Sequence, residues 1–496
     1  MLQWTTEMRY RPYEKWDSAY LQKLMTTKQN SIWHMNYHIQ PTSGLLNDPN
    51  GFSYFNGRWH LFYQFYPFGP VHGLKSWYHL SSTNLLDWEE HGYGLLPDTP
   101  FDSHGVYSGT ALPIDDKLLL AYTGNVRDKN GERASYQMGA WMDTDQQIEK
   151  IDTPLIPTPP KGYTHHFRDP QVIPYDNGYL LFIGAQTEQE TGEVLIYQSE
   201  DLTDWSLLGP LDFTKDAMGY MIECPNMLFI DEQPVLIFCP QGMEKSVTPY
   251  DNIYPNMVVV GEAFDSETQT IVQPKALQNL DHGFDLYATQ AFQAPDGRVL
   301  SIGWAGLPEI AYPTDAEDWA HCLTLVRELS LKEGHLYQKP TGEHIDLRQK
   351  EQQLKGNLQK LHTLVDNPQQ NSYELELTIT KNSQGSLHLF ADAENKHSLA
   401  LHFDSKHGKI TLDRSQVSLP FAEEFGSTRS ISLEKETTLK LQIFVDQSIC
   451  EIFVNDGHSV FTSRVFPKIE ETQLFIEGNQ GSYEGHYWEL RSTSQN

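Results

Sequence analysis

Short runs of alternating apolar and polar residues, separated by turn residues, dominate the chain from His34 to about residue 340. Examples are RWHLFYQF, KLLLAYTG, GYLLFIGA and PVLIFCP. Each run has the length of a β-strand, and the Gly, Pro, Asn and Asp residues between the runs favour turns. The sequence therefore predicts antiparallel β-structure throughout this region.

Two of these runs recur together with their flanking residues. SSTNLLDWEEHG at 81–92 resembles QSEDLTDWSLLG at 198–209, so that Asp87-Trp88 aligns with Asp204-Trp205, 117 residues later. Half of that distance accommodates four short strands, which is the content of one propeller blade. Residues 34–340 have room for five such units, and we predict a five-bladed β-propeller.

The segments on either side of this region have other patterns. Within residues 1–33, Trp16, Tyr20, Leu21 and Met25 follow helical spacing and predict a short N-terminal helical arm. The polar stretch GEHIDLRQKEQQLKG (342–356) predicts a helix in a linker that spans 341–360.

The remaining residues, 361–496, again alternate strictly. Runs such as SYELELTI, HSLALHFD and LKLQIFVDQSICEIFVND are typical of two packed antiparallel sheets. We therefore expect an all-β protein in which a β-sandwich follows the propeller.

The charge and the cysteines limit the partners and the compartment. A formal net charge of −30 argues against nucleic acid or an anionic membrane as a partner, because both need clustered Lys and Arg. The sequence shows neither a signal-peptide pattern nor an apolar run of membrane-spanning length. Its four cysteines are far apart and lack metal-ligand spacing, which predicts reduced thiols and a cytoplasmic protein.

Three acidic residues share one local pattern. GLLNDPNGF (44–52) contains Asp48, FRDPQV contains Asp169 and IECPNM contains Glu223; in each case a proline and an apolar run follow. Taken alone, Pro-Asn-Gly indicates a turn, and an aspartate there serves turn geometry. However, the acids are 121 and 54 residues apart, about two blades and one blade, so we expect them to converge at one end of the channel.

Converging carboxylates suit glycoside hydrolysis, in which one acts as nucleophile or base and another donates a proton to the leaving oxygen. Glu223 is the predicted proton donor. Arg168 is expected to lower the pKa of the adjacent Asp169 and to keep it anionic. The content of 11 Trp and 25 Tyr suits a sugar-binding cleft, but aromatic residues also fill β-structure.

Six ordered blocks resemble glycoside hydrolase family 32. They are GLLNDPNG, FRDP, ECP, GFDLYATQAF, GWAG and YPTDAEDWAHCLTLVRELSL, and the similarity continues through ICEIFVNDGHSVFTSRVFP in the sandwich. The resemblance implies a retaining β-fructofuranosidase with Asp48 as nucleophile, Glu223 as acid/base and Asp169 as stabiliser of the bound fructose. It implies neither a cofactor nor a metal. The implied substrate-binding residues are Leu45, Leu46, Asn47, Gln64, Trp77, Tyr107, Ser108, Arg168 and Trp304.

Within the family, RYRPYEKW, HGLKSWY and YTGNVRDKNGER are most similar to enzymes that hydrolyse sucrose 6-phosphate. Leu45, Leu46 and His72 also stand where many relatives carry Trp or Met. A phosphate needs charged donors. The candidates for phosphate binding are His72, Lys75, Arg127 and Arg133.

Several alternatives stay open at this point. The chain could be an invertase or a fructan hydrolase with the same three acids, a noncatalytic carbohydrate-binding propeller, or a five-bladed hydrolase of arabinose polymers. A monomer and a homodimer are both compatible with the sequence.

Overall fold

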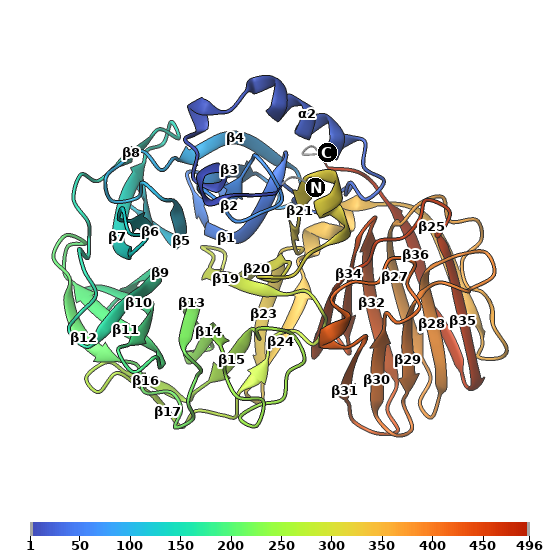
Figure 1. Ribbon diagram of the computed structural model, residues 1–496. Helices are drawn as coiled ribbons and strands as arrows, with labels where there is room; N and C mark the ends of the chain where they lie inside the picture. Colours follow the sequence, from blue (N-terminus) through green and yellow to red (C-terminus); the bar gives the residue numbers. More distant parts are fainter. Residues whose placement is uncertain (1–2, 494–496) are drawn as a thin grey trace.

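Five antiparallel sheets surround a central channel, as the computed structural model of the chain shows for the described residues, 3–493 (Figure 1). From the channel outward, the first blade contains β1 (Gly44–Phe55), β2 (Arg58–Tyr66), β3 (Ser76–Ser82) and β4 (Trp88–Leu95). The second contains β5 (Val106–Ile114), β6 (Lys117–Arg127), β7 (Arg133–Met142) and β8 (Ile148–Lys150). The third contains β9 (Tyr163–Tyr175), β10 (Gly178–Thr187), β11 (Gly192–Ser199) and β12 (Ser206–Pro210).

The last two blades complete the circle. They consist of β13 (Met221–Ile230), β14 (Gln233–Gln241), β15 (Met257–Val260) and β18 (Gln278–Asn279), with the small β16 (Ala263–Asp265) and β17 (Thr270–Val272) hairpin; and of β19 (Tyr287–Gln293), β20 (Val299–Ala305), β22 (Cys322–Leu323), β23 (Arg327–Lys332) and β24 (His335–Pro340). The prediction of a five-bladed propeller is confirmed.

The repeated Asp-Trp pairs occupy equivalent places in two blades. Trp88 begins β4, and Trp205 directly precedes β12, so both mark the outermost strand of their blade. Strand β21 (Trp319–Ala320), which follows the fifth blade's inner strands, pairs in parallel with β1 and joins the last blade to the first. The repeated Asp-Trp pair therefore marks the same position in the first and third blades, as the predicted period requires.

A ring of side-chain hydrogen bonds joins the inner strands. Each inner strand contributes one polar residue to it, and these residues are Asn50, Thr110, Gln171, Asn226 and Gln290. Each one bonds to the backbone of the next blade; for example, Asn50 accepts from the Gly109 amide at 3.0 Å, and Gln290 closes the circle by accepting from Phe52. Buried amides need such partners, so the ring fixes the relative heights of the five strands.

The N-terminal arm covers the edge of the first blade. It contains α1 (Thr6–Arg9), the 3₁₀ turn η1 (Tyr13–Lys15) and α2 (Ser18–Gln29), which begins at the N-cap Asp17. The indole of Trp16 stacks on Phe68 with ring centroids 4.4 Å apart, and the Tyr13 hydroxyl donates to the Leu74 carbonyl at 2.7 Å. The prediction of a helical arm is confirmed, although Trp16 precedes the helix.

Two six-stranded sheets form the sandwich beside the propeller (Figure 1). One contains β25 (Arg348–Asn357), β36 (Ser482–Leu490), β27 (Ser372–Ile379), β32 (Leu439–Asp446), β33 (Ile449–Val454) and β34 (Ser459–Arg464); the other contains β26 (His362–Thr363), β35 (Gln473–Gln480), β28 (Gln384–Ala391), β29 (Leu399–Asp404), β30 (Lys409–Asp413) and β31 (Thr428–Ser432). Short 3₁₀ turns lie at η2 (Pro313–Glu317), η3 (Gly342–Leu347) and η4 (Glu423–Phe425).

The prediction of a linker helix over 342–356 is wrong beyond Leu347. Only η3 is helical, and the following residues form β25, an edge strand of the sandwich. Most side chains of an edge strand face solvent, so Leu354 is the single buried residue of β25. The polar composition of this strand therefore concealed its period of two.

A buried charge network holds the sandwich against the propeller. Arg327 of β23 forms an ion pair with Glu451 of β33 at 2.5 Å and approaches Asp281 at 3.3 Å. His38, which precedes the first blade, lies between Glu451 and Asp446 at 3.0 and 2.9 Å. These groups are 0 to 3% exposed, so the two domains share one polar, fully enclosed interface.

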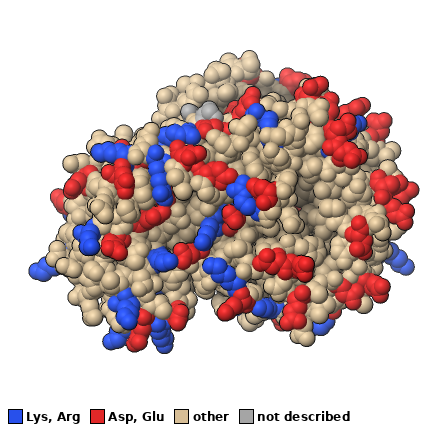
Figure 2. Space-filling view, turned by 180° about the vertical axis from the view of Figure 1, so that it is seen from behind, with Lys and Arg blue, Asp and Glu red and all other residues tan. Residues whose placement is uncertain are grey.

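Acidic side chains are distributed over the surface. In the view from behind, Asp and Glu occur over much of the visible face with Lys and Arg among them, and no single-sign patch covers it (Figure 2). The four cysteines are free and buried.

Candidate active site

Asp48, Asp169 and Glu223 lie on the inner strands of blades one, three and four. Each lies at a β-bulge, where the register of its strand against the neighbouring strand shifts. Asp169 and Cys224 have positive φ angles of 69° and 49°. A bulge redirects a side chain that would otherwise follow the strand alternation. The thiol of Cys224, next to Glu223, lies 3.8 Å from Asp48 and 3.6 Å from Asp169, so the three acids meet at one end of the channel, as predicted.

The prediction of a turn at Pro49-Asn50-Gly51 is wrong. These residues continue β1, which has register shifts at Asn47/Pro49 and between Asn50 and Ser53. Gly51 supplies a positive φ of 55°, and Asn50 belongs to the ring of hydrogen bonds. The residues that favour turns therefore form bulges within a strand.

Three side chains donate hydrogen bonds to the carboxylate of Asp48. Asn47 donates to Oδ1 at 2.9 Å, and Gln64 and Ser108 donate to Oδ2 at 3.1 and 2.5 Å. Burial raises the pKa of Asp48, the bonds from Ser108 and Asn47 oppose this, and the charge of Glu223 adds to it. The carboxylate is thus fixed in orientation by donors from three strands.

Asp169 is held by the strand that carries Glu223. Its Oδ2 accepts from the backbone amide of Cys224 at 2.9 Å, and the Cys224 thiol lies 3.6 Å from the same oxygen. Burial raises the pKa of Asp169 to about 7, with Arg168 opposing and Glu223 and Asp48 adding to the increase. The expectation that Arg168 lowers this pKa below its usual value is wrong, because burial and the two neighbouring acids outweigh Arg168.

The guanidinium of Arg168 is committed to Glu223. Its Nε and Nη2 donate to Oε1 of Glu223 at 2.9 and 2.7 Å, and the hydroxyl of Tyr287 donates to Oε2 at 2.7 Å. Both carboxylate oxygens are therefore held by donors. Tyr287 is not among the residues predicted from the sequence, although it lies within the block GFDLYATQAF. The available signal was a polar residue at the start of the inner strand of the fifth blade.

The other predicted substrate-binding residues divide into two groups. Asn47, Gln64, Ser108 and Arg168 contact the acids directly, as described above, and Tyr107 precedes Ser108 on β5 and is half-buried. Leu45, Leu46, Trp77 and Trp304 are instead enclosed by protein, with at most 2% of each side chain exposed. These four side chains pack inside the protein, and their contact with substrate stays a prediction.

The two tryptophans show why. Trp77 packs near Phe62 and Tyr122, and its indole nitrogen donates to the Tyr107 carbonyl at 3.0 Å. Trp304 lies 6.1 Å from the Tyr287 ring, and its indole nitrogen has no hydrogen-bond partner in the described chain. Trp77 therefore supports β5 from behind, and Trp304 supports Tyr287.

The four candidates for phosphate binding also differ. Lys75 is 2% exposed and donates to the amide oxygen of Asn47, so it faces the acids from within. His72 is exposed on the loop between β2 and β3, 6.1 Å from the Trp304 ring. Arg127 and Arg133 are half-buried at the facing ends of β6 and β7. Lys75 is therefore the enclosed member of the four, and phosphate binding by each of them stays a prediction.

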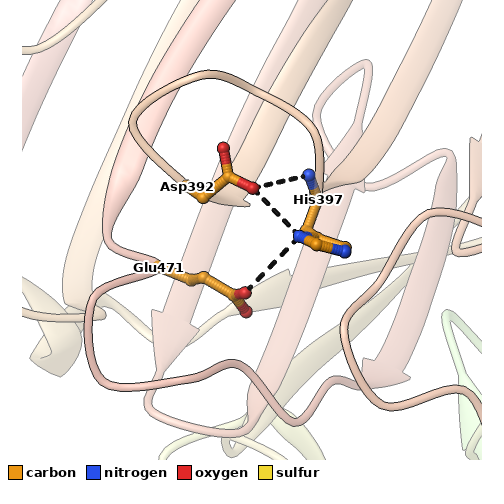
Figure 3. Close-up of side chains that lie close together, drawn as sticks. All are labelled: Asp392, His397 and Glu471. Atoms are coloured by element: carbon orange, nitrogen blue, oxygen red, sulfur yellow. Dashed lines mark hydrogen bonds and ion pairs between the residues drawn. The ribbon is translucent and has the colours of Figure 1, made fainter.

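One group of His and acidic side chains lies elsewhere, in the sandwich. Asp392, His397 and Glu471 lie close together, with His397 Nδ1 3.0 Å from Asp392 and 3.9 Å from Glu471 (Figure 3). Asp392 accepts from the backbone amides of Glu394 and Lys396, and Glu471 accepts from that of Lys468. The carboxylates thus stabilise loop conformation.

No helix within residues 3–493 has the length and hydrophobicity to cross a membrane.

Comparisons with known proteins identify the family of this chain. Residues 38–340 match the model of the glycosyl hydrolases family 32 N-terminal domain, and residues 343–489 match that of the family 32 C terminal. A sucrose-6-phosphate hydrolase of Pediococcus pentosaceus is 49% identical over 99% of this chain and 97% of its own length, and one of Lactococcus lactis is 43% identical over 99% and 100%.

Solved structures show the same relationship. The sucrose-6-phosphate hydrolase of Lactobacillus gasseri superposes with a TM-score of 0.95 at 44% identity, covering 99% of this chain and 100% of the other. A family 32 β-fructofuranosidase of Bombyx mori has a TM-score of 0.82 at 30% identity and covers 95% and 97%. This chain belongs to glycoside hydrolase family 32.

Proposed function

We propose that this chain is a retaining β-fructofuranosidase that hydrolyses sucrose 6-phosphate, and also sucrose, to fructose and glucose 6-phosphate or glucose. The observation that carries the proposal is the meeting of Asp48, Asp169 and Glu223 at one end of the channel, each held by named donors. The relatives that are 49 and 43% identical over their full length act on this substrate by name.

In the first half of the reaction, Asp48 attacks the anomeric carbon of the fructosyl unit while Glu223 donates a proton to the departing glucosyl oxygen. The bonds from Asn47 and Ser108 keep Asp48 in one orientation, so that little reorganisation is needed before attack. In the second half, Glu223 removes a proton from water, which releases fructose from Asp48.

Asp169 has a separate role, in binding the fructosyl hydroxyls. Its pKa near 7 allows it to accept hydrogen bonds when ionised and to donate one when protonated. Arg168 and Tyr287 position Glu223 by holding its two carboxylate oxygens.

We also propose a cytoplasmic location and a monomeric or homodimeric state. Four buried free thiols suit a reducing compartment.

The test is kcat/KM on sucrose 6-phosphate and on sucrose, measured side by side with one enzyme preparation. A preference of tenfold or more for the phosphorylated substrate, about 1.4 kcal/mol, supports the proposal. Equal values would favour an invertase. No turnover of either substrate would contradict the assignment of a β-fructofuranosidase to this chain.

A further inference from the structure

Three arginines gather on blades two and three next to the proposed acid/base. Arg127 ends β6 and faces Arg133 at the start of β7, where the two residues are register partners. Arg168 follows on β9 and holds Glu223. In a protein with a formal charge of −30, three neighbouring guanidinium groups at the mouth of an acidic site need an explanation.

The imidazole of His166 links two of these arginines. Its Nδ1 lies 3.3 Å from Arg133 Nη1 and 3.1 Å from Arg168 Nη1. A single nitrogen that receives two guanidinium donors must be the unprotonated one, so the imidazole is neutral. In agreement, partial burial and the charges of Arg168 and Arg133 lower the pKa of His166 to about 4.

Arg127 and Arg133 form no ion pair with a carboxylate of the described chain, whereas several other arginines do. Arg168, Arg298, Arg327, Arg348 and Arg491 all form ion pairs with carboxylates. Within residues 3–493, Arg127 bonds only to the Gly131 carbonyl and Arg133 only to neutral His166. Neighbouring like charges are unfavourable unless anions balance them, and the one carboxylate of this cluster, Glu223, is already paired with Arg168, so a ligand anion would stabilise Arg127 and Arg133.

The pKa shifts of Arg133 and Tyr107 agree with positive charge gathered at this place. Burial lowers the pKa of Arg133, and the charges of Arg168 and Arg127 lower it further. Tyr107, which belongs to the proposed substrate site, lies close enough for all three arginines to act on its pKa. The arginine pair is therefore next to the place where the substrate binds.

We propose that Arg127 and Arg133 bind the 6-phosphate of the glucosyl unit, and that His166 positions Arg133 for this contact. The inference rests on the proposed function and names the residues that give the enzyme its preference for the phosphorylated substrate. A phosphate dianion can receive paired donors from each planar guanidinium, which a lysine cannot offer. Lys75 is enclosed and bonded to Asn47, so we assign it the separate role of orienting Asn47.

The experiment compares wild type, Arg127→Gln, Arg133→Gln and the double variant. For each we would measure the ratio of kcat/KM on sucrose 6-phosphate to kcat/KM on sucrose, and the inhibition constant of glucose 6-phosphate relative to that of glucose. We expect each ratio to change at least tenfold in a single variant and further in the double variant. Arg133→Lys should give an intermediate ratio, because lysine keeps the positive charge but lacks the planar pair of guanidinium donors.

Arg58→Gln is the matched control. Arg58 begins β2 opposite Phe55, at the other end of the channel, and pairs with the exposed Glu89. The Arg58→Gln substitution removes one positive charge without affecting the proposed contact. The ratio of the two kcat/KM values should therefore equal that of wild type. Thermal melting of all variants checks that they fold.

The outcomes separate the two proposals. If wild type prefers the phosphorylated substrate and the arginine variants keep that preference, the phosphate subsite is wrong and the proposed function stands. If wild type shows no preference and glucose 6-phosphate inhibits no better than glucose, both the preference and this subsite are overturned.

Discussion

The ammonium group of Lys75 donates a hydrogen bond to the side-chain oxygen of Asn47, and the amide nitrogen of Asn47 donates to Asp48. Burial lowers the pKa of Lys75 to about 7, although the charge of Asp48 acts in the opposite direction. A lysine in this position orients the amide and, through it, the proposed nucleophile.

Replacing Lys75 with Met should lower kcat by about 10- to 100-fold, because Asn47 then loses the contact that fixes its orientation. The loss should be the same for sucrose and for sucrose 6-phosphate. Lys117→Met, at the exposed turn between β5 and β6, is the control and should leave both values unchanged. A selective loss on the phosphorylated substrate would instead show that Lys75 contacts the phosphate.

Asp48→Asn and Glu223→Gln should each reduce turnover of sucrose by about 10²- to 10⁴-fold or more. They should differ on a fructoside whose leaving group needs no proton. On that substrate Glu223→Gln recovers formation of the fructosyl-enzyme, seen as a burst of leaving group, whereas Asp48→Asn does not. Near-native turnover of sucrose by either variant would sink the proposed mechanism.

Asp169 should make the protein less stable at neutral pH. Its pKa is about 7 in the folded protein against 3.8 in the unfolded chain, so the folded state binds more protons between these values. The contribution of Asp169 to the free energy of unfolding therefore falls as the pH rises from 3.8 to 7. Asp169→Asn removes this loss and should raise the melting temperature at pH 8, with a smaller difference at pH 4.

The matched control for this measurement is Asp116→Asn, an exposed carboxylate in the turn between β5 and β6. It should melt as wild type does at both pH values. A melting temperature of Asp169→Asn below that of wild type at pH 8 would contradict the assignment. Loss of activity in the more stable variant is the expected exchange between stability and function.

Arg327→Met should destabilise the protein by about 3 to 5 kcal/mol, because it leaves the buried Glu451 and Asp281 without their cation. Arg327 and His38 hold the pKa of Glu451 at about 2 despite burial, so this carboxylate is ionised at neutral pH. The measurement is the free energy of unfolding from denaturant titration at pH 7.

The control for Arg327 is the exposed pair of Lys440 and Asp456 in the sandwich, with half or more of each side chain exposed. Lys440→Met should change the free energy of unfolding by less than about 1 kcal/mol. Equal effects of the two variants would show that the interface between the domains contributes little to stability.

The sequence predicted the propeller, the sandwich and the convergence of the three acids, because these depend on local alternation, on turn residues and on a repeat that returns each acid to the same place in its blade. Its errors have a common origin. The turn at Asp48 is a bulged strand, and the helix at 348–356 is an edge strand, because local propensity does not reveal the pairing of a strand.

What the sequence determined by itself is therefore the architecture and the placement of Asp48, Asp169 and Glu223 in equivalent positions of three blades. Only the tertiary structure decided which donors hold the acids, namely that Arg168 and Tyr287 both bind Glu223. It also decided which residues are buried: Lys75 is enclosed beside Asn47, and Trp77 and Trp304 are core residues. The reason is that hydrogen bonds and burial depend on side chains brought together from different blades, over distances in sequence that no local pattern records.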